Sequence, residues 1–419
     1  MADKWTKYKL SELGFLGRGK SKHRPRNDIS LFGGSYPFIQ TGEIKAANLY
    51  ISNYEQTYNE KGLAQSKLWN EGTLCMTIAA NIAETAILKI KACFPDSIVG
   101  FVADNKLCNV YFIKYYIDFI KNKMQSVSGG ACQDNLSLDK IAYFDIEAPK
   151  KKIQDKIAKI LSNYDDLIEN NNKRIKILEE MAQKIYKEWF VDFKFPNHET
   201  ATFKDSELGK IPSDWEISTL ENILSGIESG SRPKGGINPN DKEIPSIGAE
   251  NILGLGKYDY NKEKYISNDF YEKMKKGKVK DLDVLLYKDG AQLGRKSIFG
   301  ENFPHSKCCI NEHVFILRTN PKCSPYYLYF TLDTIENTER IKQLNTNAAQ
   351  PGINQKQVKG LTIILPLKKY IEKFDNVVKP IVSQIFKLCI KNQTFKQTRE
   401  LLLPRLISGE IDVENLNIL

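Results

Sequence analysis

The N-terminal region contains a run of cations whose spacing suits a polyanionic ligand. These cations are Arg18, Lys20, Lys22, Arg24 and Arg26, one at every second position. In an extended segment, a period of two places all five side chains on one face, and Pro25 favours extended or loop structure. We therefore predict a ribbon that faces phosphate groups. A basic loop that is simply solvated is the alternative interpretation.

Further polar and basic side chains occur in both halves of the chain. Gln40 and Thr41 are candidates for contacts with base edges, because glutamine can pair with an adenine edge. Gln133 and Gln350 are also candidates, with a packed amide at the next helix start as the alternative. The cations expected to contact nucleic acid in the second half are Arg232, Lys234, Lys276, Lys278, Arg295 and Lys296. The formal net charge of +10 agrees with an anionic partner, but charge alone indicates only nonspecific binding.

The same N-terminal loop matches a nucleotide-binding motif. Residues 14–21 (GFLGRGKS) satisfy the phosphate-loop expression G-x4-G-K-[ST]. A functional phosphate loop follows a buried strand and begins a helix whose N-terminus faces the phosphates. The preceding segment is only half apolar, Pro25 stops a helix within one turn, and residues 224–231 in the second half lack the motif. We expect no nucleotide binding here, and a phosphate-loop protein with a coiled-coil hairpin is the alternative.

Histidine and cysteine side chains suggest a second kind of site. His305, Cys308, Cys309 and His313 carry the groups that zinc prefers, but their spacing is unusual for zinc and the first half has no counterpart, so we expect no metal. The eight cysteines show no CxxC spacing, which predicts reduced, mostly buried thiols. There is no run of 18 apolar residues and no signal-peptide pattern, so we expect a cytoplasmic protein without a membrane segment.

Two long helices are the elements expected to position these side chains. A heptad pattern of apolar residues runs from 153 to 190 and returns after a shift of 217 positions. One seam position holds Ile157, Tyr164, Asn171, Leu178 and Ile185, and later Phe374, Ile381, Leu388, Phe395 and Leu402. The other holds Ile160, Leu167, Arg174 and Met181, and later Val377, Gln384, Lys391 and Thr398. Such a period requires a partner helix, and we predict that the two helices pair antiparallel.

Each helix follows a globular segment of related sequence. Trp5 begins WTKYKLSEL, and Trp215 begins the similar WEISTLENI. Short strand-like runs mix with helical stretches, of which 111–124 and 325–343 are the clearest. We predict an α+β fold with an internal pseudo-two-fold repeat, in which two long antiparallel coiled-coil helices separate two globular domains. The predicted boundaries are 1–150 (first domain), 151–191 (central helix), 192–214 (linker), 215–368 (second domain) and 369–419 (C-terminal helix and tail).

The whole chain resembles a specificity subunit of a Type I restriction-modification enzyme. The resemblance rests on 207–212 (ELGKIP) with Trp215, 189–193 (WFVDF) and 403–411 (LPRLISGEI), and on the segments that begin at Gln133 and Gln350. No single motif among these is highly specific. Together with the half-chain repeat, they strongly indicate this family. The globular segments are then identified as two target recognition domains.

The resemblance implies a chain that reads DNA and performs no reaction itself. Each recognition domain would read one half of a bipartite, asymmetric site in double-stranded DNA. The helices would dock two adenine methyltransferase subunits and, through them, two restriction subunits. S-adenosylmethionine, ATP and magnesium would bind to those partners, and this chain would need no cofactor. A structural coiled-coil linker is a further alternative, against which the two divergent globular segments argue.

The predicted docking residues lie one position beyond the heptad seam. They are Ile168, Ile175, Val378 and Ile385. A two-helix rod leaves apolar side stripes that need cover, so we expect methyltransferase subunits to bind there. The alternative is that these residues only widen the seam between the two helices.

Overall fold

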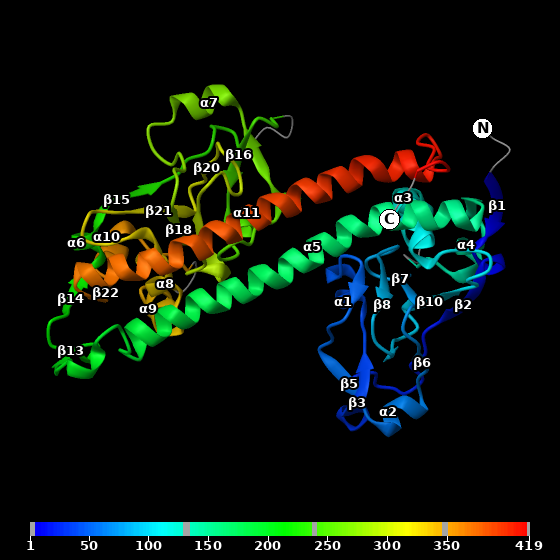
Figure 1. Ribbon diagram of the computed structural model, residues 1–419, viewed down its shortest axis with the longest axis horizontal. Helices are drawn as coiled ribbons and strands as arrows, with labels where there is room; N and C mark the ends of the chain where they lie inside the picture. The colour runs from blue at the N-terminus through cyan, green and yellow to red at the C-terminus, as the bar shows by residue number, and fades with distance from the viewer. Residues whose placement is uncertain (1–4, 129–134, 237–240, 346–350, 417–419) are drawn as a thin grey trace. The chain divides into compact units, whose positions relative to one another are not determined.

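The computed structural model describes residues 5–128, 135–236, 241–345 and 351–416 (Figure 1). Contacts within the chain divide it into two compact units. The first unit comprises Met1–Glu169 and Thr394–Leu419, and the second comprises Asn170–Gln393. Helices α5 (Lys151–Tyr186) and α11 (Lys368–Ile407) each contribute to both units.

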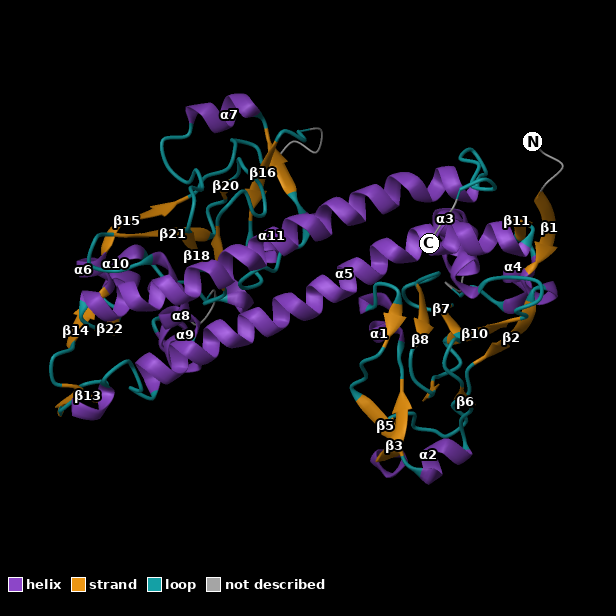
Figure 2. Ribbon diagram, viewed as in Figure 1, coloured by secondary structure: helices purple, strands orange, loops and turns teal. Residues whose placement is uncertain are grey.

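The first unit is built on two sheets with short helices around them (Figure 2). Its strands are β1 (Trp5–Lys9), β2 (Gly14–Arg18), β3 (Phe32–Phe38), β4 (Tyr50–Ile51), β5 (Gln56–Tyr58), β6 (Leu68–Trp69), β7 (Leu74–Thr77), β8 (Thr85–Leu88), β9 (Ala92–Cys93), β10 (Ile98–Ala103) and β11 (Asp145–Pro149). Its helices besides α5 and α11 are α1 (Thr41–Ala46), α2 (Glu60–Ala64), α3 (Val110–Ser128) and α4 (Leu138–Ala142). The sheet orders are β2-β10-β7-β8-β4 and β5-β3-β9-β6, and β1 pairs with β11.

The second unit contains a comparable set of elements. Its strands are β12 (Phe203–Ser206), β13 (Gly209–Pro212), β14 (Glu216–Thr219), β15 (Leu224–Ser229), β16 (Ile244–Ile247), β17 (Lys264–Ile266), β18 (Asp283–Tyr287), β19 (Lys296–Phe299), β20 (Cys309–Ile310), β21 (Val314–Thr319) and β22 (Thr362–Leu365). Its helices are α6 (Leu220–Ile223), α7 (Asn268–Lys273), α8 (Pro325–Asp333), α9 (Ile335–Gln343) and α10 (Gln355–Lys359).

The strand orders confirm the internal repeat. The second unit has a sheet β15-β21-β18-β19, which matches β2-β10-β7-β8, and a sheet β17-β16-β20, which matches β5-β3-β9. In the two smaller sheets the corresponding pairs β3–β9 and β16–β20 are both parallel. The pair β14–β22 corresponds to β1–β11, and each pair ends directly before a long helix. The predicted α+β fold with a duplicated module is therefore confirmed.

The two predicted helical stretches differ in outcome. The stretch 111–124 lies within α3, as expected. The stretch 325–343 is two helices, because the chain leaves the helical conformation at Thr334. The Thr334 hydroxyl accepts a hydrogen bond from the backbone N–H of Asn337 at 3.2 Å, so this residue begins α9 as an N-cap.

Helices α5 and α11 pack antiparallel within each unit. In the first unit, the rings of Tyr164 and Phe395 are 6.2 Å apart, and the buried Asp165 carboxylate forms an ion pair with Arg399. The second unit places Tyr186 5.9 Å from the ring of Phe374. In the first unit Lys156 contacts Glu414 and Asp165 contacts Arg399, and in the second unit Asn171 contacts Asn392 and Tyr186 contacts Phe374. Rising residue numbers along α5 thus meet falling numbers along α11 and the segment that follows it.

One of the two predicted seam rows is wrong. On α5, Leu167 and Met181 are 46% and 47% exposed. The buried row lies one position further on and contains Leu161, Ile168, Ile175 and Ala182. The physical reason is that each helix packs against a globular module as well as against its partner helix. The rows three and four residues after the first seam row both lie next to it on the helix surface. Packing against the core of the module buries the row four residues on.

The same shift occurs on α11. Val377 is 41% exposed and Lys391 is exposed, whereas Val378 and Ile385 are 0% exposed. The other predicted row is correct in part, because Phe374 and Leu388 are buried and Phe395 is half-buried.

Candidate nucleic-acid interface

Only Arg18, the first residue of the predicted basic ribbon, lies in a strand. Strand β2 ends at Arg18, and the following residues form a loop held by backbone contacts. The Gly19 N–H donates to the carbonyl of Ile98 at 2.8 Å, and a Cβ on Gly19 would lie 2.2 Å from the Pro95 carbonyl oxygen. The backbone N–H of Lys22 donates to Gln65 Oε1 at 2.7 Å. The expectation that five cations share one face of an extended ribbon is therefore wrong.

The arginines of this loop are used within the protein. Arg26 Nη2 donates to both carboxylate oxygens of Asp96, at 2.7 and 2.9 Å. Arg18 Nε donates to the Asp96 backbone carbonyl at 3.0 Å, and Arg24 Nη1 donates to the carbonyl of Ser21 at 2.7 Å. These bonds draw all three guanidinium groups towards the loop and the β9–β10 turn.

Lys20 and Lys22 are the cations of the loop that face solvent. Both side chains are exposed, and neither forms an ion pair with any residue that the structure describes. Asp28 closes the loop by hydrogen bonds with Ser30 and His23. The backbone N–H and the hydroxyl of Ser30, followed by His23, lower the Asp28 pKa to about 2, so this carboxylate stays charged at neutral pH.

A recess beside the loop brings together three of the predicted contact residues. Arg26, Gln40 and Thr41 line a cavity of ≈ 420 Å³ in the first unit. Gln56 and Ile29 line the same cavity. Gln40 Nε2 donates to Gln56 Oε1 at 3.1 Å. Sequence reasoning missed Gln56 and Ile29, because no local pattern shows that β5 and the segment before β3 border Gln40.

The predicted cations of the second module are divided between solvent and internal partners. Lys234 and Lys276 are exposed. Arg232 pairs with Glu312 at 2.9 Å. Lys278 lies 3.8 Å from Glu272 and over the Tyr271 ring, 4.8 Å from its centroid.

Lys296 is a structural residue instead of a surface cation. Its side chain is 4% exposed, and Nζ donates to Thr338 Oγ1 at 2.6 Å and lies 3.6 Å from Asp333. Burial lowers the Lys296 pKa, and Asp333 opposes this effect. The predicted phosphate contact of Lys296 is corrected for this reason. Its neighbour Arg295 is half-buried and lines a separate cavity of ≈ 450 Å³. Gln133 and Gln350 lie outside the described residues.

The other candidate sites do not have the geometry that they require. Residues 14–18 form strand β2 in a sheet, so no helix N-terminus follows the phosphate-loop motif. His305 pairs with Glu263, and His313 Nδ1 lies 2.8 Å from Asp289. Among the described residues, no group of three metal-binding side chains comes together. The seven cysteines in the described ranges are buried free thiols, as predicted. No described helix is long and apolar enough to cross a bilayer.

The predicted docking residues are packed inside the chain. Ile168 and Ile175 are 9% and 7% exposed, and Val378 and Ile385 are fully buried. Gly256, at φ +67°, is so close to the helices that a Cβ there would lie 2.5 Å from Ile385 Cγ2. These side chains stabilise the seam and the module contact, which favours the alternative interpretation that they widen the seam.

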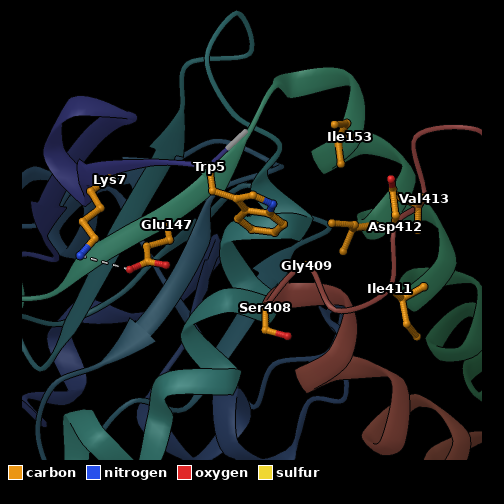
Figure 3. A pocket seen from close by; sticks show the side chains of 10 residues that line it. Trp5, Lys7, Glu147, Ile153, Ser408, Gly409, Ile411, Asp412 and Val413 are labelled. Atoms are coloured by element: carbon orange, nitrogen blue, oxygen red, sulfur yellow. Dashed lines mark ion pairs between the residues drawn. The ribbon is translucent and has the colours of Figure 1, made fainter. Parts of the chain in front are cut away.

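The C-terminal motif has a packing role in the first unit. Figure 3 shows Trp5 beside Gly409, in a cavity of ≈ 430 Å³ that is also lined by Ile411 and Val413. Gly409 follows α11 at φ +75°, and a Cβ on it would lie 2.9 Å from Trp5 Nε1. Lys156 Nζ holds the tail by donating to the Glu414 carbonyl at 2.7 Å. The glycine of 403–411 is needed because it ends the helix and makes room for the tryptophan.

Comparison with known proteins agrees with this architecture. A curated relative, the Type I restriction enzyme MjaIX specificity subunit of Methanocaldococcus jannaschii, is 26% identical over 98% of this chain and 94% of its own length. The Type I restriction enzyme HindI specificity subunit of Haemophilus influenzae is 24% identical over 97% of this chain and 99% of its own. The crystal structure of a Type I restriction-modification S subunit from M. genitalium has the same fold, with a TM-score of 0.60, 14% identity and 96% coverage of both chains.

The repeat observed in the fold is also the unit of the family match. The family model described as the Type I restriction modification DNA specificity domain matches residues 2–180 and again residues 212–400. Each match contains one module and most of the long helix that follows it. The chain belongs to the family of Type I restriction modification DNA specificity domains.

Proposed function

We propose that this chain is the DNA-reading subunit of a Type I restriction-modification complex. The observation that carries the proposal is the duplicated module, matched twice by the family model, with the same strand order before each long helix. Each module would read one half of a bipartite double-stranded site. The loops of the two modules differ in their charge partners, Arg26 with Asp96 in one and Arg232 with Glu312 in the other. We therefore expect two different half-sites and an asymmetric target.

The proposed role requires no catalysis by this chain. Its histidines are paired with carboxylates, and burial raises the pKa of its cysteine thiols, as for Cys108, whose pKa is raised to about 11. A thiol of this kind is a poor nucleophile. S-adenosylmethionine, ATP and magnesium would bind to two methyltransferase and two restriction subunits. The complex would act in the cytoplasm.

The exposed faces of the long helices are the proposed docking surface for the methyltransferase subunits. In the first unit, Leu167 is 46% and Leu401 is 72% exposed. In the second unit, Ile177, Met181 and Val377 are 56%, 47% and 41% exposed. Large apolar side chains that recur on the outside of a helix are typical of an interface with another protein. This surface replaces the buried residues expected from the heptad pattern.

Selection from a library of random duplexes tests the proposal. The full chain, assembled with the methyltransferase subunit of its host, is expected to enrich one consensus with two specified segments separated by an unspecified gap. Methylome sequencing of the host should show the same two segments. Binding that depends on salt and length but never on sequence would contradict the proposed function.

A further inference from the structure

We propose that the recess lined by Gln40, Gln56 and Ile29 reads an adenine–thymine base pair in the major groove of one half-site. This inference rests on the proposed function and names the base pair that the first module reads. All three side chains line the same cavity of ≈ 420 Å³. The first two are exposed amides, and the third is an exposed aliphatic side chain.

The amide pair presents the hydrogen-bonding groups that match adenine. Gln40 Nε2 uses one N–H to bond Gln56 Oε1 at 3.1 Å. A carboxamide also has a second N–H and an oxygen, and a donor beside an acceptor is what adenine N7 and N6–H₂ require. Exchanging the nitrogen and oxygen of both amides would give Gln56 the same free donor and acceptor. The match to adenine therefore does not depend on how the amides are oriented.

Guanine fits this arrangement poorly. In the major groove guanine offers two acceptors, O6 and N7, so its O6 would face the amide oxygen that adenine N6–H₂ satisfies. Arginine is the usual reader of guanine, and Arg26 lines this recess. Both of its contacts, at 2.7 and 2.9 Å, go to the carboxylate of Asp96. Nη2 of the one guanidinium group that lines the cavity is thus held by a carboxylate of the protein itself.

The thymine of the pair has a matching contact in Ile29. This side chain is 89% exposed, which is costly for a large aliphatic group in water. It begins a short 3-10 helix whose position is held by Asp28, through the hydrogen bond from the Ser30 N–H at 2.9 Å. An aliphatic side chain is a suitable partner for the C5-methyl group of thymine. Ile29 and the amide pair line one cavity, so one base pair would meet the amides on its adenine and Ile29 on its thymine.

Changing Gln40 tests the adenine contact directly. The full chain in complex with its methyltransferase subunit is compared with the Gln40→Ala variant in selection from random duplexes. We expect the preference for A·T over G·C to fall by about 5- to 150-fold at one position of one half-site. The other half-site should be unchanged, which also reports that the variant is folded and assembled. Gln56→Ala should reduce the same preference.

Changing Ile29 tests the thymine contact. Replacing the thymine at that position by deoxyuridine removes only the methyl group and should weaken binding by the unchanged protein. The same replacement should have no effect on the Ile29→Ala variant. Asn70→Ala, which removes an exposed amide of the same unit outside the recess, is the matched control and should keep the full consensus.

The outcomes separate this inference from the proposed function. A Gln40→Ala variant that keeps the same consensus at every position would overturn the inference, and so would equal loss of binding to all sequences. In the first of these cases the proposed function would stand. If the unchanged protein itself shows no sequence preference, the proposed function fails and the inference fails with it.

Discussion

At the scale of single residues, charge spacing in the sequence does not show which cations are free. The five alternate cations near the N-terminus have different environments. Arg26 is bound to Asp96, while Lys20 and Lys22 extend into solvent. A cation that already has a carboxylate partner contributes less to a phosphate contact, because binding DNA would require it to exchange one anion for another. The two lysines are therefore the expected phosphate contacts.

We expect the Lys20→Ala, Lys22→Ala double variant to weaken binding to all DNA sequences alike. Each lost phosphate contact should reduce the slope of log K against log salt concentration by about 0.9. The slope is measured by titrating specific and nonspecific duplexes at several salt concentrations. Lys106→Ala removes an exposed lysine from the turn before α3 and serves as the control. An unchanged slope in the double variant would mean that the loop is only solvated.

At the scale of elements, the long helices carry two apolar rows with different roles. The row through Ile168 and Ile175 is buried by the partner helix and the modules. The row through Leu167 and Met181 is half-exposed. Adjacent positions such as Leu167 and Ile168 thus differ, because Ile168 stabilises the chain and Leu167 belongs to the proposed docking surface.

We expect Leu167→Asp and Met181→Asp to prevent co-purification with the methyltransferase subunit while the chain stays folded. A charge at an exposed site should change the free energy of unfolding by less than about 1 kcal/mol. Ile175→Asp instead places an unpaired carboxylate in a site that is 7% exposed, which should cost several kcal/mol. Pull-down and thermal unfolding distinguish the two classes.

Gln183→Asp is the control for these variants, because Gln183 is an exposed polar residue of the same helix. It should retain both the fold and the partner. Full assembly of the Leu167→Asp and Met181→Asp variants would exclude this row from the interface.

At the scale of the whole molecule, the two modules are connected by helices that both continue from one unit into the other. The division falls between Glu169 and Asn170 on α5 and between Gln393 and Thr394 on α11. Just beyond it, Asn171 Nδ2 donates to Asn392 Oδ1 at 2.8 Å. A polar pair of this kind specifies the register of a helix pair, so a change of length must be made in both helices.

Four residues inserted at both points should lengthen the gap between the half-sites by about one or two base pairs. One added turn is about 6 Å, and B-DNA rises about 3.4 Å per base pair. The half-sites should not change, since the modules are untouched. Methylome sequencing of cells that carry the variant measures the gap. The control receives the same four residues in the β12–β13 turn, and an active insertion variant with the original gap would show that the helices do not set the spacing.

The sequence by itself determined the duplicated α+β architecture, the two long helices and the antiparallel pairing. Apolar periodicity and repeated segments, such as those after Trp5 and Trp215, indicate these features. Both signals can be recognised without knowing which distant residues are in contact. The family also followed from sequence, and the family model matches residues 2–180 and 212–400.

Only the tertiary structure decided which side chains are accessible. The heptad pattern allowed both Leu167 and Ile168 to face the seam, and the contact with a globular module selected Ile168. Likewise, the approach of Gln56 to Gln40 and of Asp96 to Arg26 joins residues distant in the chain. Local propensity carries no information on such pairings, because they arise from the packing of strands that are far apart in sequence.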